Sequence, residues 1–119
     1  MKTFRKLIVW QKSIAFVTRI YKSVNGFPKE ELYGLTSQIK RSAVSVPSNI
    51  AEGYGRNANK EFIRFLRIAM GSLFEIQTQL EIAQNLNFFD EEVYFELYED
   101  SREIERMLSS LIGKLSAKG

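Results

Sequence analysis

Apolar residues recur every three or four positions along four long segments of the chain, and this spacing constrains the fold more than any other feature. Such steps place side chains on one face of an α-helix. Four helices with short connections favour antiparallel neighbours, so we predict an all-α fold: one up-down-up-down four-helix bundle domain over residues 1–119. In chain order, the series are Leu7, Trp10, Ile14, Val17, Tyr21 and Val24; Leu32, Leu35, Ile39, Val46 and Ile50; Phe62, Phe65, Leu66, Ala69, Leu73, Ile76, Leu80 and Ala83; and Val93, Leu97, Ile104, Leu108, Leu111 and Leu115.

A proline interrupts the second series without breaking its spacing. Pro47 lies three residues after Val44 and three before Ile50. Its missing N–H removes one backbone hydrogen bond, which bends a helix or ends it. We predict a second helix that bends near Pro47. The alternative is a break at which Ser48 or Asn49 caps a new turn.

The residue inventory removes several classes of chemistry. The chain has no cysteine and no histidine, so it has no thiol nucleophile, zinc-thiolate site or imidazole base. We therefore expect no catalytic residue, no bound metal and no cofactor, and a protein that is not an enzyme. No apolar run is long enough to cross a bilayer, and we expect a cytoplasmic protein with no membrane contact.

Charge is unevenly distributed along the chain. Residues 1–67 contain 13 Lys and Arg against 4 Asp and Glu, whereas residues 68–119 contain 4 against 10, within a total of +3. Such a division is typical of a nucleic-acid surface, of opposite charges that meet between subunits, or of two solvated helix faces. The composition leaves these three interpretations open.

Two polar stripes follow helical spacing on the second and third helices. If the chain turns near Arg56, position 41 lies near 72 and position 38 near 75, which allows a network that fixes the helix register. In that network Arg41 is buried against Glu75. The alternative is that one stripe is simply solvated. The polar residues are Gln38, Arg41, Ser45, Asn49 and Glu52 on one helix, and Ser72 and Glu75 on the other.

Basic residues also recur at helical spacing. Lysine and arginine at this spacing suit contacts with phosphates, although they also form ordinary solvated faces. Tyr54, in a turn bounded by glycines, is placed either to stack on an unpaired base or to pack against another subunit. The candidate nucleic-acid-binding residues are Tyr54, Arg56, Lys60, Arg64 and Arg67, together with Lys12, Arg19 and Lys22.

The aromatic content is high for a small bundle, with nine Phe, five Tyr and one Trp. The first helix has a second apolar line at Ile8, Phe16 and Ile20, and Tyr94, Phe95 and Tyr98 widen the fourth. Apolar area beyond one core indicates self-association. We therefore expect a homo-oligomer.

Two motifs carry a family resemblance over nearly the whole chain. The run SVPSNIAEG, followed by EFIRFLRIAMGSLFE, resembles a four-helix bundle family first noticed as reading frames in intervening sequences of bacterial large-subunit ribosomal RNA genes. The same family includes the accessory variability proteins of diversity-generating retroelements. The resemblance implies a homopentameric, barrel-like ring. It also implies a basic surface that, in the retroelement members, binds nucleic acid and the reverse transcriptase.

Two functions are compatible with these observations. The first is an oligomeric binding or accessory protein that engages RNA or DNA through a basic helix face. The alternative is a protein-binding oligomeric scaffold with no nucleic-acid ligand. The two hypotheses differ in the role of the cations, which contact phosphates in the first and neighbouring subunits in the second.

Overall fold

The computed structural model describes residues 3–118, which fold into four long helices, as predicted. The long helices are α1 (Ile8–Ser23), α2 (Leu35–Tyr54), α3 (Asn59–Asn85) and α4 (Glu91–Ala117). Short 3₁₀ turns η1 (Phe4–Lys6), η2 (Val24–Gly26) and η3 (Lys29–Glu31) precede or follow α1 and α2. No strand occurs in these residues, which confirms the all-α class.

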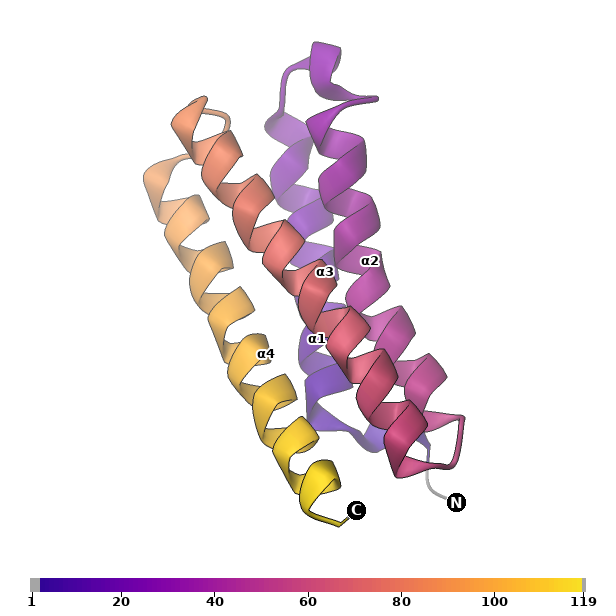
Figure 1. Cartoon of the computed structure of the whole chain (residues 1–119). Coiled ribbons are helices and arrows are strands. Elements are labelled where there is room, and N and C mark those ends of the chain that lie inside the picture. The colour runs from indigo at the N-terminus through magenta and orange to yellow at the C-terminus, as the bar shows by residue number, and fades with distance from the viewer. Residues whose placement is uncertain (1–2, 119) are drawn as a thin grey trace.

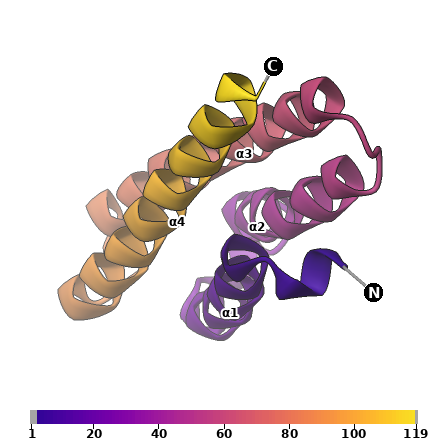
Figure 2. The ribbon, with the colours of Figure 1, turned by 90° about the horizontal axis from the view of Figure 1, so that it is seen from below.

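The helices run alternately up and down along a molecule of 46 × 22 × 21 Å (Figure 1). Each helix packs against the helices that precede and follow it in sequence, and α1 also packs against α4. Both chain ends and the turn between α2 and α3 lie at one end of the rod, while the α1–α2 and α3–α4 connections lie at the other. Figure 2 looks along the rod at the first of these ends.

The core series of α3 is confirmed in full. All eight predicted positions, from Phe62 to Ala83, are buried. On α4 the inner positions Leu97, Ile104 and Leu108 are buried, while Val93, Leu111 and Leu115 pack against the core from its edges. The three-and-four spacing was sufficient here because this series forms one continuous stripe, whereas the other large apolar residues Ile68, Phe74 and Ile82 are fewer and lie outside it, about two-fifths to one-half exposed.

The predicted core face of α1 was wrong in part. Phe16 and Ile20, which the sequence placed on a second line, are fully buried, whereas Ile14 and Tyr21 are about two-fifths exposed. The buried face also contains Ser13. Its hydroxyl donates to the Val9 carbonyl at 2.7 Å, which satisfies the polar group inside the core.

Helix α2 begins at Leu35 and continues through Pro47 to Tyr54, as predicted, so the alternative of a break at Ser48 or Asn49 is wrong. Pro47 itself is buried. The acidic residues before the helix have a capping role, because the Glu31 carboxylate accepts a hydrogen bond from the Leu35 N–H at 3.2 Å. Leu32, expected in the core, is half exposed because it precedes the helix.

Helix α2 packs tightly on α3 at Gly53. A Cβ at this position would lie 2.6 Å from the Phe65 Cβ and 3.1 Å from the Phe62 ring. Glycine is therefore required for the backbones to approach so closely near the turn. The turn itself is short, and Asn57 adopts a positive φ of 60°.

Candidate nucleic-acid interface

The fold collects basic residues at one end of the rod. Residues 3–11, 52–67 and 106–118 lie at the end that contains the chain termini and the α2–α3 turn (Figures 1 and 2). We call this region the basic end. It has nine Lys and Arg against two acidic residues, Glu52 and Glu61. The nine are Arg5, Lys6, Arg56, Lys60, Arg64, Arg67, Arg106, Lys114 and Lys118.

The opposite end has the opposite charge. Residues 19–41 and 75–100, which we call the acidic end, have ten Asp and Glu against five Lys and Arg. Its acidic character comes from residues 75–100, with eight Asp and Glu and no Lys or Arg, whereas residues 19–41 have five Lys and Arg against two Glu. The charge division seen along the sequence therefore becomes in part a division along the 46 Å axis of the molecule. Such an arrangement gives the rod a large dipole and orients it toward anionic partners by one end.

Two arginines of the basic end rest on one buried ring. The guanidinium carbons of Arg56 and Arg64 lie 5.0 Å and 4.6 Å from the Phe65 ring centroid. Each arginine also contacts an acidic residue nearby in sequence, Arg56 with Glu52 at 2.8 Å and Arg64 with Glu61 at 3.3 Å. These contacts hold both guanidinium groups in place while leaving about half of each side chain exposed.

The other candidates on α3 are exposed and less constrained. Lys60 and Arg67 form no ion pair with any residue between positions 3 and 118. Arg67 lies beside Met70 and Phe74, on the side of α3 that faces the C-terminal part of α4. The turn and the first turns of α3 thus present Arg56, Lys60, Arg64 and Arg67 together, as the sequence spacing suggested.

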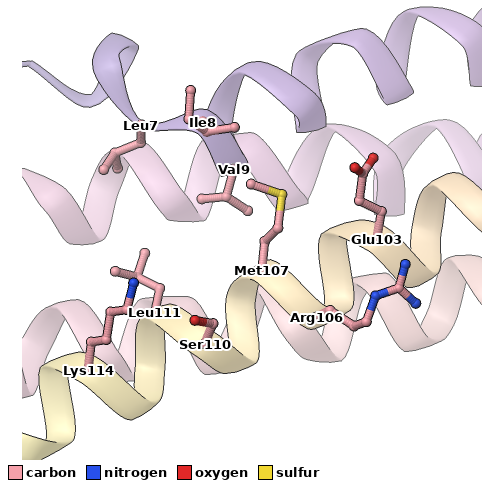
Figure 3. Close-up of a pocket in the computed structure, with 9 residues that line it drawn as sticks. All are labelled: Leu7, Ile8, Val9, Glu103, Arg106, Met107, Ser110, Leu111 and Lys114. Atoms are coloured by element: carbon pink, nitrogen blue, oxygen red, sulfur yellow. The ribbon is translucent and has the colours of Figure 1, made fainter.

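A groove between the start of α1 and the C-terminal half of α4 adds cations to the same end (Figure 3). Met107 and Leu111 of α4 point toward Leu7 and Val9 across a space of about 530 Å³. Arg106 and Lys114 stand on its α4 side, together with one carboxylate, Glu103. These two cations, together with Arg5, Lys6 and Lys118, were not predicted from the sequence, because no helical stripe connects them to the turn.

The predicted basic stripe of α1 has a different environment. Lys12 lies 3.5 Å from Glu103, and Arg19 lies 2.8 Å from Asp100. Both acidic partners belong to α4, so these two cations join neighbouring helices. Lys22 is exposed and, in the last turn of α1, belongs to the acidic end. The stripe is therefore divided between internal ion pairs and the far end of the molecule.

Tyr54 packs inward. Its ring meets the Phe62 ring edge-on, with centroids 5.8 Å apart and an interplanar angle of 90°. The side chain is half buried and belongs to the edge of the core. A base would therefore have to displace an existing aromatic contact to stack on Tyr54.

The two polar stripes meet, but through small residues. The hydroxyls of Ser45 and Ser72 are 2.8 Å apart, and the Asn49 side-chain amide donates to the Ser45 hydroxyl at 2.9 Å. One turn further along, Gln79 donates to Ser42 at 3.3 Å. These contacts join α2 to α3 in a part-buried layer.

The expected contact between Arg41 and Glu75 is not formed, because the register differs from the predicted one by one helical turn. Position 72 pairs with position 45 instead of 41. The first turn of α3 extends beyond the α2 terminus, where Gly53 faces both Phe62 and Phe65, and this shifts the pairing along the helices. The remaining members of the predicted network are exposed: Gln38, Arg41, Glu52 and Glu75.

Other kinds of site find little support in the described part of the chain. Among residues 3–118 no three His, Cys, Asp or Glu side chains are grouped so that they would hold a metal ion. Within the same residues, no helix combines the length and apolar character needed to span a membrane. Burial and the nearby Glu81 raise the pKa of the Tyr94 hydroxyl above its ordinary value, but this residue lies near the acidic end.

The geometry defines a class of protein: a small antiparallel four-helix bundle with one strongly cationic end. A family model described as 23S rRNA-intervening sequence protein matches residues 5–110. The chain therefore belongs to the family of 23S rRNA-intervening sequence proteins, which confirms the resemblance seen in its motifs.

A solved structure has the same fold. It is the crystal structure of a protein with unknown function from the S23 ribosomal protein family of Bacteroides thetaiotaomicron VPI-5482. It is 30% identical in sequence, with a TM-score of 0.82 over 89% of this chain and 96% of that one. A search of curated proteins finds no match. Family membership thus identifies the fold and leaves the role to be argued from the charge distribution.

Proposed function

We propose that this protein is a non-enzymatic, oligomeric nucleic-acid-binding protein whose basic end contacts the phosphates of RNA or DNA. The observation that carries the proposal is the gathering of nine Lys and Arg against two Glu at one end of the rod. Each phosphate contact releases condensed counterions, so a dense group of cations binds nucleic acid without reading its sequence. This refines the sequence hypothesis of a basic helix face to a basic end.

Self-assembly is part of the proposal. Large apolar side chains remain exposed on the single chain, among them Phe74 at 47%, Ile68 at 42% and Phe95 at 62%. Apolar surface of this kind is typical of subunit contacts. In a closed ring with parallel subunit axes, such as the homopentamer that the family resemblance implies, the basic ends of all subunits share one face. Several weak sites then act together on one nucleic acid.

The test compares two double charge reversals at opposite ends. Lys60→Glu with Arg67→Glu changes the basic end, while Lys22→Glu with Lys29→Glu makes the same change in charge at the other end. All four side chains are exposed and none is paired within residues 3–118, so both variants should fold. Binding of a labelled RNA is titrated at several salt concentrations.

We expect the basic-end variant to lose at least about ten-fold in affinity and to show a shallower salt dependence. The far-end variant should lose much less, because its charges lie beyond a Debye length of about 8–10 Å from the bound phosphates. Equal losses in both variants, or no binding by the unmodified protein at low salt, would contradict the proposal.

The alternative function is a protein-binding scaffold with no nucleic-acid ligand. The exposed apolar residues favour it, since they fit a polypeptide partner as well as a second subunit. A reverse transcriptase is the partner that the retroelement members of the family imply. On this alternative, reversal of Lys60 and Arg67 changes the size of the assembly in sedimentation equilibrium, whereas on the main proposal it leaves the size unchanged.

A further inference from the structure

We infer that the basic end recognises the paired, double-helical backbone of a nucleic acid in preference to unpaired strands. This inference rests on the proposed function and adds the structural class of the ligand. Its basis is the environment of the aromatic rings at the basic end. Single-strand binding proteins combine cations with exposed aromatic rings on which successive bases stack.

Every aromatic ring of the basic end already has an intramolecular partner. Phe4 and Trp10 pack edge to face with centroids 5.1 Å apart, and the Arg5 guanidinium lies 4.9 Å from the Phe4 centroid. Tyr54 and Phe62 pack edge to face at 5.8 Å. None of these four rings is among the strongly exposed apolar side chains of residues 3–118.

The fifth ring, Phe65, is both buried and covered. Its exposed fraction is 9%, and the guanidinium groups of Arg56 and Arg64 lie over it. An arginine seated on a ring presents its N–H groups outward in a fixed orientation. The ring therefore serves to position cations and has no free face for a base.

The exposed aromatic rings lie outside the basic end. Tyr33 is 92% exposed at the α1–α2 connection, beside Lys40 and Arg41, and Phe95 is 62% exposed near the start of α4. Phe74, 47% exposed, lies beside Arg67 in the apolar surface that the proposed function assigns to subunit contacts. In the proposed assembly, no ring of the basic end therefore has a free face for a base.

Charge density then decides which form binds better. For each ten-fold rise in salt concentration, the logarithm of the association constant falls by about 0.9 per phosphate contact with a duplex and by about 0.7 per contact with a single strand. If each form makes about five phosphate contacts and both bind equally at about 1 M salt, the duplex binds roughly ten-fold more tightly than the single strand at about 0.1 M salt.

The experiment titrates the full chain with a short RNA duplex and with one of its strands, designed without self-pairing, at equal phosphate concentration over a salt series. Tighter binding of the duplex by several-fold, with the steeper salt dependence, supports the inference. Equal or tighter binding of the single strand overturns it while leaving the proposed function intact. Binding of neither probe overturns the proposed function and the inference with it.

A gain-of-function variant tests the missing stacking surface directly. Ala58 is exposed in the α2–α3 turn, so Ala58→Tyr adds an accessible ring among the cations without disturbing the core. Ala58→Leu is the matched control. We expect the tyrosine variant to gain about five-fold or more for the single strand, because one stacked base contributes at least ~1 kcal/mol, and to gain less for the duplex. An equal gain for both probes, or none, would contradict the inference.

Discussion

Gly53 and Phe65 meet so closely that a Cβ on residue 53 would lie 2.6 Å from the Cβ of Phe65. No real pair of side chains tolerates this distance, so either α2 or α3 would have to move. The contact lies directly beneath Arg56 and Arg64, because Phe65 is the ring on which both guanidinium groups rest. The packing of α2 on α3 and the position of these cations are therefore linked.

Gly53→Ala should destabilise the bundle by about 1–3 kcal/mol through overpacking. Gly71→Ala is the matched control, since a Cβ there meets nothing within 4 Å. Alanine in an open helix interior should stabilise by about 0.5–1 kcal/mol. Urea unfolding measures both free energies, and a neutral or stabilising Gly53→Ala would show that the helices have more room than the structure describes.

Phe65→Leu should weaken nucleic-acid binding without altering the charge of the protein. Loss of the ring releases two guanidinium groups, and one exposed cation–π contact contributes about 0.5–1 kcal/mol, or about two- to five-fold in affinity. The salt dependence should stay unchanged because the number of cations is the same. Phe62→Leu is the control: its ring is equally buried but contacts Tyr54 and no arginine. Equal effects of the two substitutions would mean that only folding was changed.

Ser72→Ala should lower the free energy of unfolding by about 1 kcal/mol relative to Ser48→Ala. Ser72→Ala removes the hydroxyl that forms a hydrogen bond with the Ser45 hydroxyl between α2 and α3. Ser48→Ala removes an exposed hydroxyl of α2. The comparison cancels the general preference of helices for alanine. Equal stabilities of the two variants would show that the Ser45–Ser72 contact adds nothing to the register.

Arg41→Ala should change the free energy of unfolding by no more than about 0.5 kcal/mol, because Arg41 is exposed and has no ion-pair partner within residues 3–118. A buried pair with Glu75 would instead cost several kcal/mol when broken. Thermal unfolding of Arg41→Ala beside the unmodified protein distinguishes the two cases.

Lys12→Ala with Arg19→Ala should leave nucleic-acid affinity within about two-fold of the unmodified value while lowering stability by about 1 kcal/mol or less. Both side chains pair with α4, through Glu103 and Asp100. A loss of affinity similar to that of the Lys60 and Arg67 reversals would contradict this prediction and show that Lys12 and Arg19 contribute to nucleic-acid binding.

The regular parts of the fold could be predicted from sequence. The α3 core is complete in the pattern because its main apolar series forms one continuous stripe, with only Ile68, Phe74 and Ile82 outside it. The α1 core is not complete in the pattern, since apolar residues lie on two sides of the helix. Ser13 was also missed, because a polar residue is not expected in the core unless a contact such as its hydrogen bond to the Val9 carbonyl satisfies its hydroxyl. Periodicity gives the inward direction only when one face is clearly the more apolar.

The site was predictable only where its residues share a local pattern. Arg56, Lys60, Arg64 and Arg67 follow one another across a turn and along one helix. Arg5, Lys6, Lys114 and Lys118 join them only because alternating helix directions bring both chain ends to the α2–α3 turn. The register between α2 and α3 was wrong for a similar reason. The first turn of α3 extends beyond the end of α2, and the spacing of residues within one helix does not indicate such an extension.

The most direct test of the central claim is lysine acetylation of the folded protein, quantified at each site with and without bound RNA duplex. We predict protection of Lys60, Lys114 and Lys118 at the basic end and unchanged modification of Lys22 and Lys29 at the acidic end. Uniform protection of all five lysines, or protection confined to Lys22 and Lys29, would contradict it.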